Sequence, residues 1–437
     1  MTSRIYSLAL LLLCVLLPFG AIAQQDLNLF FMPRAMQVQE VNPAILNQKT
    51  VSVGLPSLYV QGLHSGFAWQ DLVKSVPGSD SLQLDPASAI AQMDDMNLIR
   101  LNVNADILSL AIKIKGLQVS AFAGSRLDVG IRYPRDLVAL AWEGNTDYTG
   151  QTLNLAPDFQ ATAWNEIGAG VATKLGKHID VGVRLKYLAG MADVSAGKRQ
   201  ASFTTAAETY DLSLEADYEI QTAVFSLGDL DSIRPELSFQ PFTGNQGLAA
   251  DLGINVRLWK DRIQLSASAV DLGYINWSKG TKRYTAQGSI RFEGIDPFTL
   301  LTHDSIDTQA FADSLLGGIT FTEAPATYRS YLPARLYVGG TLTAMKFLRV
   351  GAVFHTELYR GEWYPAFAVH AGADLGKILS GGLTWSVRNH RLDNLGANLL
   401  LKLGPVVVYS ACDNLTAFLA PQAAQQTNLR LGMNLYF

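Results

Sequence analysis

The sequence predicts an all-β protein, a transmembrane antiparallel β-barrel of about fourteen strands with an N-terminal plug segment and long extracellular loops. Three observations predict this fold. The closing stretch 427–437 alternates apolar and polar residues with the period of a strand. Runs of about ten residues with the same alternation, long enough to cross a bilayer as tilted strands, recur from residue 333 onward. No stretch beyond the first residues is apolar for long enough to form a spanning helix.

Composition agrees with a barrel that faces lipid. Hydrophobic residues make up 49% of the chain, charged residues make up 16%, and the net charge is −4. Soluble proteins carry about 25% charged residues, whereas barrel strands alternate apolar and polar residues behind a weak overall hydropathy signal. The nearly balanced charge indicates no nucleic-acid partner. On composition alone, a large soluble β-protein is the alternative.

The first residues have the features of a secretory signal. Arg4 precedes an apolar run over 5–17, and Ala21–Ile22–Ala23 offers a cleavage site. This run is shorter than the roughly 20 residues that a membrane anchor needs. We therefore expect residues 1–23 to be a signal peptide and the mature protein to reach a cell outer membrane of the Gram-negative type. Cleavage would leave Cys412 as the last cysteine, which excludes an internal disulfide.

The mature chain divides into a plug segment over 24–48 and a barrel over 49–437. Strands are expected to begin near residues 50, 99, 117, 160, 177, 248, 262 and 333, with six more after that. The apolar phase shifts between Ala105 and Leu108, which predicts a β-bulge. An even number of strands is typical of a single-chain barrel.

The connections between these strands sort by length. Short turns are expected at 115–116, 176, 260–261, 345–346, 376 and 404, and they alternate with long connections at 65–97, 133–159, 193–247, 276–332 and 413–427. Because outer-membrane barrels have short periplasmic turns and long external loops, the insertions 65–97, 133–159, 193–247 and 276–332 are expected outside the cell. Short helices are expected near 86–93, 136–142 and 308–316, and an added acidic hairpin over 201–222.

Alternation assigns a set of polar residues to the lumen. The lumen-lining or ligand-binding candidates are Arg349, His355, Glu357, His370, Asp374 and Arg388. In the structural interpretation, neighbouring strands bring opposite charges together and the polar side chains satisfy one another. In the functional interpretation, Arg349, Arg388 and His370 line a passage or hold the head group of an anionic amphiphile.

Motifs for catalysis, metal binding and nucleotide binding are missing from the sequence. The histidines lack HExxH spacing, no G-x-S-x-G marks a nucleophile, and no G-x-G-x-x-G leads into a helix. Ser386, His370 and Asp374 could meet across strands, but wall lining is the favoured interpretation. We expect no enzyme activity, no catalytic residues, no metal and no cofactor. The acidic run 208–219 is interpreted as a solvated hairpin face rather than a calcium site.

Several motifs resemble a known group of barrels. Asn42–Pro43–Ala44 and the closing pattern Arg430-x-Gly432-x-x-Leu435-x-Phe437 resemble the FadL-like superfamily of the long-chain fatty-acid outer-membrane transporter. Residues 51–56, 67–72 and 133–137 are similar to an uncharacterised branch of that superfamily, which is itself similar to the barrel proteins that accompany type IX secretion.

The resemblance implies a function and a set of partners. The implied plug residues, near the periplasmic mouth, are Asn42, Pro43 and Ala44, and the implied assembly signal, read by the barrel assembly machinery, is Arg430, Gly432, Leu435 and Phe437. The implied function is to bind or transport a hydrophobic or amphipathic small molecule in a barrel surrounded by outer-membrane lipid. The insertions 193–247 and 276–332 depart from the transporter pattern. They equally suit a non-transporting partner of a secretion or surface-assembly system.

Overall fold

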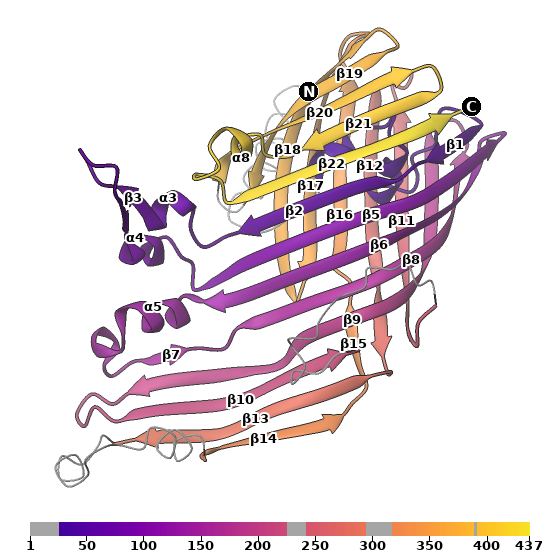
Figure 1. Cartoon of the computed structure of the whole chain (residues 1–437). Helices are drawn as coiled ribbons and strands as arrows, with labels where there is room; N and C mark the ends of the chain where they lie inside the picture. Colours follow the sequence, from indigo (N-terminus) through magenta and orange to yellow (C-terminus); the bar gives the residue numbers. More distant parts are fainter. Residues whose placement is uncertain (1–25, 225–241, 294–316, 389–390) are drawn as a thin grey trace, which may run out of the picture.

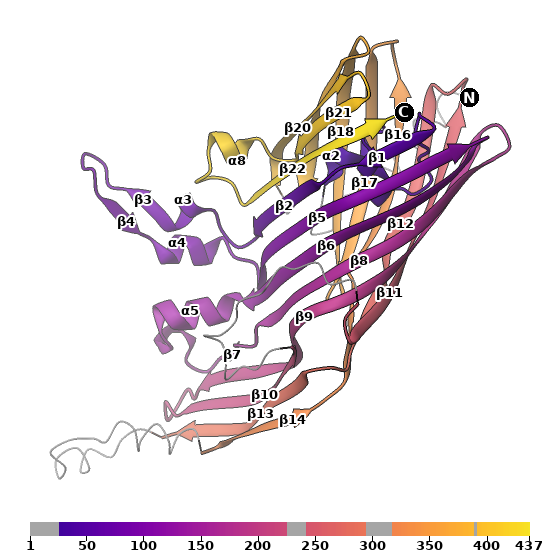
Figure 2. The ribbon, with the colours of Figure 1, turned by 45° about the vertical axis from the view of Figure 1, so that its right-hand side comes forward.

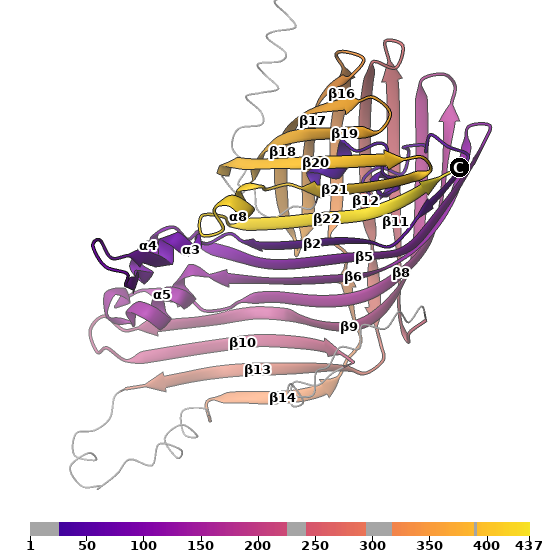
Figure 3. The same ribbon diagram turned by 45° about the horizontal axis from the view of Figure 1, so that its top comes forward.

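The computed structural model describes residues 26–224, 242–293, 317–388 and 391–437, with the side chains of 388–393 excluded. These residues form a closed antiparallel barrel of 14 strands, which confirms the predicted fold. The last strand, β22 (Gln426–Tyr436), closes the cylinder by pairing with β1 (Val51–Gly54) and β2 (Ser57–His64) (Figure 3). Because β1 and β2 both also pair with β5 (Met96–Ile114), they form one wall strand interrupted at residues 55–56.

The other wall strands follow one another around the barrel in chain order, each antiparallel to its neighbour (Figure 1). They are β6 (Leu117–Pro134), β8 (Asp158–Leu175), β9 (Ile179–Thr205), β11 (Asn245–Leu258), β12 (Ile263–Trp277), β16 (Ala334–Thr343), β17 (Leu348–Tyr359), β18 (Glu362–Leu375), β19 (Leu379–Arg388), β20 (Arg391–Leu403) and β21 (Val406–Cys412).

One end of the barrel, here called the turn end, carries tight turns at the predicted positions. Lys115 and Gly116 have φ of 49° and 88°, and Gly176, Gly376 and Gly404 also have positive φ. A β-bulge is present where the apolar phase shifts, because the register between β5 and β6 slips between Asp106 and Leu108. The extra residue lets β5 keep its apolar side chains on the outer face.

The wall has an apolar outer surface and a largely polar inner one. Outward side chains such as Leu185, Val338 and Leu383 are 64%, 57% and 55% exposed. Inward polar side chains such as Gln118 and Asp128 are buried. This division is the one that a barrel in lipid requires, because hydrocarbon surrounds the outside and the enclosed polar groups bond to one another.

The opposite end, here called the loop end, carries most of the helices and several short strands (Figure 2). They are α3 (Trp69–Leu72), β3 (Val73–Ser75), β4 (Leu82–Leu84), α4 (Pro86–Ala91), α5 (Arg135–Glu143), the 3-10 helix η2 (Thr146–Tyr148), β7 (Thr152–Asn154), β15 (Tyr328–Tyr331) and α8 (Thr416–Leu419). The helices expected near 86–93 and 136–142 correspond to α4 and α5, whereas the one near 308–316 lies outside the described residues. None of the described helices is both long and apolar enough to cross a membrane.

Two of the motifs that carried the family resemblance meet at His64, the last residue of β2. The ring of Phe67 packs edge-on against His64 with 4.5 Å between centroids, and Tyr133 places its hydroxyl 2.5 Å from His64 Nε2. The stretches 67–72 and 133–137 therefore anchor two loop-end connections to the last residue of the wall strand β2.

Strand β9 belongs to two sheets. Its residues 179–190 pair with β11 in the barrel wall, and its residues 193–205 pair with β10 (Leu212–Ala223). Strand β10 pairs with β13 (Thr281–Phe292), and β13 pairs with β14 (Ile319–Pro325). We call the change of partner at 190–193 the fork. The strands β7, β9, β10, β13 and β14 form the loop-end sheet, seen below the barrel strands in Figure 1. The hairpin expected over 201–222 is part of this larger sheet.

The lumen is filled by the segment that precedes the first strand. Here α2 (Leu27–Phe30) and the 3-10 helix η1 (Met36–Glu40) lie inside the barrel, and the apolar side chains of the segment form the largest core cluster. Its members are Leu27, Leu29, Phe30, Phe31, Met32, Ala35 and Val41 from the plug, and Val270, Tyr337, Val353, Ala366, Ala368, Leu400, Val407, Tyr409 and Ala411 from the wall. The wall therefore turns these apolar residues inward where they pack against the plug. Each fully buried large side chain contributes about 1.5–3 kcal/mol.

The Asn42–Pro43–Ala44 stretch lies against the inside of the wall. Asn42 is fully buried, its Nδ2 donates to the Ile254 carbonyl at 3.1 Å, and its Oδ1 accepts from Ala44 N at 2.9 Å. A Cβ on Gly253 would lie 2.1 Å from Asn42 Oδ1, and a Cβ on Gly182 would lie 2.2 Å from the Pro43 carbonyl oxygen. Both wall glycines therefore give the plug the space it occupies.

We expect Gly253→Ala to loosen the plug, because the added Cβ needs the position of Asn42 Oδ1. Overpacking of this kind costs about 1–3 kcal/mol. The refolded variant should unfold at a lower temperature in a heat-modifiability gel assay and be cut by protease within residues 26–48. Gly62→Ala is the matched control, because nothing lies within 4 Å of its Cβ. If both variants unfold and are cleaved like the parent protein, the plug does not need a glycine at position 253.

Candidate functional site

The lumen candidates near the turn end join the plug to the wall. Arg349 lies 3.3 Å from Asp374, and Arg34 of the plug lies 3.4 Å from the same carboxylate. Asp374 also accepts a hydrogen bond from Ser380 at 2.7 Å. Arg349 and Asp374 are thus a mixed-charge pair, as the structural interpretation expects, and a plug residue completes it.

His370 contacts the plug rather than a catalytic partner. Its ring stacks on Phe31 with 4.5 Å between centroids, and its Nδ1 lies 2.9 Å from Thr384 Oγ1. Thr384 in turn donates to Asn28 Oδ1 at 2.6 Å. His370 pairs with Thr384 across the strands, Ser386 pairs with Ala368, and Asp374 bonds to Ser380, so the three residues are not hydrogen-bonded to one another in the described part of the chain.

His355 packs against a neighbouring wall strand. Its ring meets Tyr337 edge-on, with 4.3 Å between centroids, and it is completely buried. The side chain of Arg388 lies outside the described residues. His355 does not line the cavity described below.

The closing strand holds the plug from the other side. Arg430 forms an ion pair with Asp26, lies 3.2 Å from Glu40, and has its guanidinium 5.0 Å from the centre of the Tyr59 ring. Gly432 makes room for Tyr409, whose hydroxyl would lie 2.4 Å from an added Cβ. These two residues of the expected assembly signal therefore also have contacts in the lumen.

The other two residues of that signal take part in the pairing between β22 and β1 that closes the barrel. Leu435 pairs with Val53 of β1 in the closing ladder. The backbone of Phe437 exchanges two hydrogen bonds with Val51, at 2.9 and 3.1 Å. The last residue of the chain therefore takes part in sealing the barrel.

A group of ion pairs joins opposite walls of the barrel on the loop-end side of the plug. Arg100 on β5 lies 2.6 Å from Glu357 on β17 and 2.5 Å from Asp128 on β6, and all three side chains are buried. The guanidinium also lies 4.3 Å from the centre of the Tyr359 ring. We call this group the cross-lumen bridge. Since β5 and β17 are not neighbours in the wall, the bridge draws two distant walls together and narrows the lumen.

A second contact of this kind lies closer to the loop end. Arg360, in the turn after β17, pairs with Asp158 at the start of β8 and donates to the Ala196 carbonyl at 2.6 Å. Asp158 also pairs with Arg199 and lies 3.6 Å from Arg132. One buried carboxylate thus faces three guanidiniums, of which Arg132 also lies 3.4 Å from Glu362.

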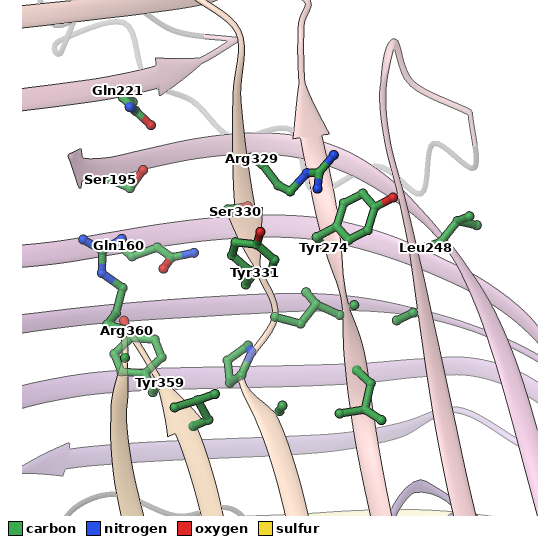
Figure 4. Close-up of a pocket in the computed structure, with 18 of the residues that line it drawn as sticks. Gln160, Ser195, Gln221, Leu248, Tyr274, Arg329, Ser330, Tyr331, Tyr359 and Arg360 are labelled. Carbon is green, nitrogen blue, oxygen red and sulfur yellow. The ribbon is translucent and has the colours of Figure 1, made fainter.

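A cavity of about 960 Å³, here called the mouth cavity, lies beside these arginines. It occupies the place where the wall ladder is incomplete: pairing between β16 and β17 ends at Ala334–Leu358, and β15 pairs only with β12 within the described residues. Figure 4 shows Gln160, Ser195 and Gln221 on one side of the cavity, Tyr331 at its centre and Leu248 on the far side.

The residues that line the mouth cavity come from both surfaces of the wall. Gln160 and Tyr359 belong to the lumen and are 8% and 3% exposed, whereas Leu185, Leu248 and Tyr331 lie on the outer surface and are 64%, 62% and 68% exposed. The cavity therefore borders both the interior of the barrel and its outer face. Its floor is a buried apolar cluster near the fork, which contains Trp277 and is here called the cluster at the fork. The indole N–H of Trp277 donates to Ser330 at 2.7 Å.

The charges around the mouth cavity have one sign. Its lining contains Arg199, Arg329 and Arg360 and no carboxylate. Arg329 has its guanidinium 4.1 Å from the centre of the Tyr274 ring and donates to Asn276 at 2.9 Å. No carboxylate of the described chain lies within ion-pair distance of it. The arrangement suits an apolar ligand that carries a negative charge.

The mouth cavity contains none of the candidate residues chosen from the sequence. Alternation indicates the side of the wall on which a residue lies, but it does not give its height in the barrel. Arg199 and Arg329 lie inside the two large insertions, where the regular pattern was not followed. The one available signal was the concentration of Tyr328, Arg329 and Tyr331 just before the last regular run.

Comparison with known proteins gives one family and a shared architecture. A model for a family of unknown function, DUF5723, matches residues 43–413. A search of curated proteins finds no match.

Among solved structures, the chain is similar in architecture to FadL-like outer-membrane barrels. A Pseudomonas aeruginosa FadL homologue matches with 10% identity and a TM-score of 0.42, over 95% of this chain and 99% of that chain. The Pseudomonas putida toluene transporter TodX matches with 7% identity and a TM-score of 0.39, over 92% of each chain.

The cross-lumen bridge yields a test of stability. Arg100→Met leaves Asp128 and Glu357 buried without their cation, and breaking a buried pair in this way costs about 3–5 kcal/mol. The variant should unfold at a much lower temperature in the gel-shift assay. Arg100→Met/Asp128→Asn/Glu357→Gln should regain most of the loss, since it removes the uncompensated charges.

Arg135→Met serves as the surface control, because Arg135 pairs with Asp95 at 3.6 Å while both side chains are largely exposed. Exposed pairs contribute about 0–1 kcal/mol. A bridge variant no less stable than this control would show that the walls do not depend on Arg100.

Proposed function

Because the chain belongs to DUF5723, a family of unknown function, we propose from its own geometry that it is an outer-membrane barrel that binds, and passes inward, an amphipathic small molecule bearing a negative charge. The mouth cavity is the binding site. The observation that carries the proposal is a cavity bordered by both the lumen and the outer apolar surface, with arginines as its only charged lining residues.

The size and chemistry of the mouth cavity support a small ligand. Pockets for small molecules occupy about 300–1,000 Å³ and combine apolar walls with a few well-placed polar groups. Here Leu185, Leu248 and Leu272 supply apolar surface, and Gln160 and Ser195 supply hydrogen-bonding groups. A ligand with an apolar body and a polar end would use both parts of the lining.

The arginines support a negative charge on that polar end. Arg199 and Arg360 share the Asp158 carboxylate, and Arg329 has no carboxylate partner among the described residues. A carboxylate, sulfate or phosphate group would find donors already in place, and hydrogen bonds to a charged group contribute about 1.5–3 kcal/mol each. A cationic ligand would meet repulsion at the same position.

Passage beyond the cavity requires a change in the lumen. The cross-lumen bridge and the plug lie between the mouth cavity and the turn end. Movement of the plug segment 26–48 would open that route, because its removal empties the centre of the barrel. In this proposal the mouth cavity selects the ligand and the plug controls its onward movement.

A second candidate function is docking of a secretion or cell-surface component, which need not involve transport. The loop-end sheet favours it, because this sheet extends past the closed part of the wall and ends on β14, whose residues Thr320–Pro325 are all exposed. Association with a type IX-like system stays a prediction.

Binding to the mouth cavity can be tested with three chain-matched probes: dodecanoate, dodecanol and dodecylamine. In equilibrium dialysis with the full-length protein in lipid nanodiscs, dodecanoate should bind most tightly and dodecylamine least. Arg329→Glu should weaken dodecanoate binding by about tenfold, equivalent to about 1.4 kcal/mol.

Arg262→Glu is the control, since Arg262 also rests on an aromatic ring, 5.9 Å from the centre of Trp259, but lies at the turn end. Equal affinity for all three probes, or equal loss in both variants, would refute the assignment of the negative charge. No binding of any probe would refute the cavity as a ligand site.

The docking candidate has its own test. Crosslinking in intact cells should capture a protein partner through β13 and β14 if docking is the function. Deletion of residues 281–325, with the barrel still folded by the gel-shift criterion, should then abolish the crosslink. A full set of crosslinked partners after that deletion would eliminate this candidate.

A further inference from the structure

The loop-end sheet has two faces of opposite character. In β10 and β13 the pairing is unbroken from Leu212–Phe292 to Ala223–Thr281, so successive side chains alternate strictly between the faces. One face carries Leu212, Leu214 and Ile290. The other carries polar side chains at every position from Ser213 to Gln221 on β10, and it leads to Ala223 in the cluster at the fork.

A basin of about 650 Å³ lies on the polar face, where β7, β9, β10 and β13 run side by side. Ser202 pairs with Glu215, and Glu215 with Ser289. In the next row Gln200 pairs with Asp217, and Asp217 with Gln287. We call this basin, with these six residues, the polar basin. Its groups are about 4.8 Å apart across strands and about 7 Å apart along them.

Most of these groups have no partner in the described part of the chain. Gln200, Glu215 and Gln287 are exposed, and their side chains take part in no hydrogen bond or ion pair there. Asp217 differs, because Lys198 donates to both of its oxygens at 3.0 and 3.3 Å. The basin thus presents two amides, two hydroxyls and one unpaired carboxylate in a fixed array.

This array matches the chemistry of a polyhydroxylated ligand. Each amide side chain offers both donors and acceptors, and a carboxylate accepts from two neighbouring hydroxyls. Such groups placed in two dimensions can bond several hydroxyls of one rigid ring at once. The unpaired Glu215 disfavours phosphate, sulfate or carboxylate groups, because like charges repel, and the cation in the lining, Arg199, is already paired with Asp158.

We propose that the polar basin is a saccharide-binding site, specific for neutral or amino sugars presented from the loop end. An extended peptide fits less well, because strand addition uses backbone groups at a sheet edge, whereas the basin uses side chains in the middle of the sheet. The six residues of the polar basin do not line the mouth cavity. The two meet at Arg199, which lines both.

The test is a printed array of neutral, amino and acidic oligosaccharides, probed with the full-length protein in lauryldimethylamine oxide, a detergent that contains no sugar. We expect neutral or amino saccharides to retain the protein and acidic ones not to do so. Gln200→Ala/Gln287→Ala should lower the affinity for the best saccharide at least tenfold in a titration by surface plasmon resonance.

Ser213→Ala is the matched control, because Ser213 lies on the same face and outside the lining of the basin. A parallel panel of unstructured peptides separates the two classes of ligand. Retention by peptides alone, by acidic sugars alone or by no spot would overturn the proposal, as would equal losses in both variants. Dodecanoate binding, measured in the same variants, should be unchanged, which separates this result from the test of the mouth cavity.

Discussion

A strand in lipid must have both of its edges hydrogen-bonded within the protein, because hydrocarbon offers no partner for a backbone N–H or C=O. The closure of β22 on β1 and β2, continued to the last residue by Phe437 and Val51, satisfies this constraint. The ladder between β16 and β17 stops at Ala334–Leu358, and β15 has one described partner strand. Such a break is tolerated only where water reaches the backbone. The mouth cavity lies at this break in the ladder, which we therefore expect at the edge of the membrane zone.

A second constraint acts inside the barrel, where each buried charge needs a counter-charge. The pairs on Arg100, Arg360 and Arg430 meet this need by reaching across the lumen or into the plug, and Arg100 also pairs along its own wall with Asp128. Pairs of this kind contribute little net stability compared with apolar packing. Their effect is positional, since they set the distance between opposite walls.

The sequence was sufficient to predict the wall strands, but it was not sufficient to predict the contacts inside the barrel. Alternation located the wall strands and the bulge near Leu108, because period-two patterns report the side of a sheet directly. It placed Val353 and Leu400 on the inward face by phase, but it could not report that the plug covers these apolar side chains. It also could not pair Arg100 with Glu357, which are 257 residues apart. The fork was hidden because β9 alternates on both sides of it.

The fork explains why the two candidate sites are adjacent. Strand β9 enters the fork paired with β11, which curves into the barrel, and leaves it paired with β10, which continues as a free sheet. The polar side of β10 carries Gln221 into the lining of the mouth cavity and Asp217 into the polar basin. A molecule that approaches along the loop-end sheet therefore meets amides and hydroxyls before it meets arginines and leucines. The order of the side chains along β10 thus sets the order in which a ligand would meet the two candidate sites.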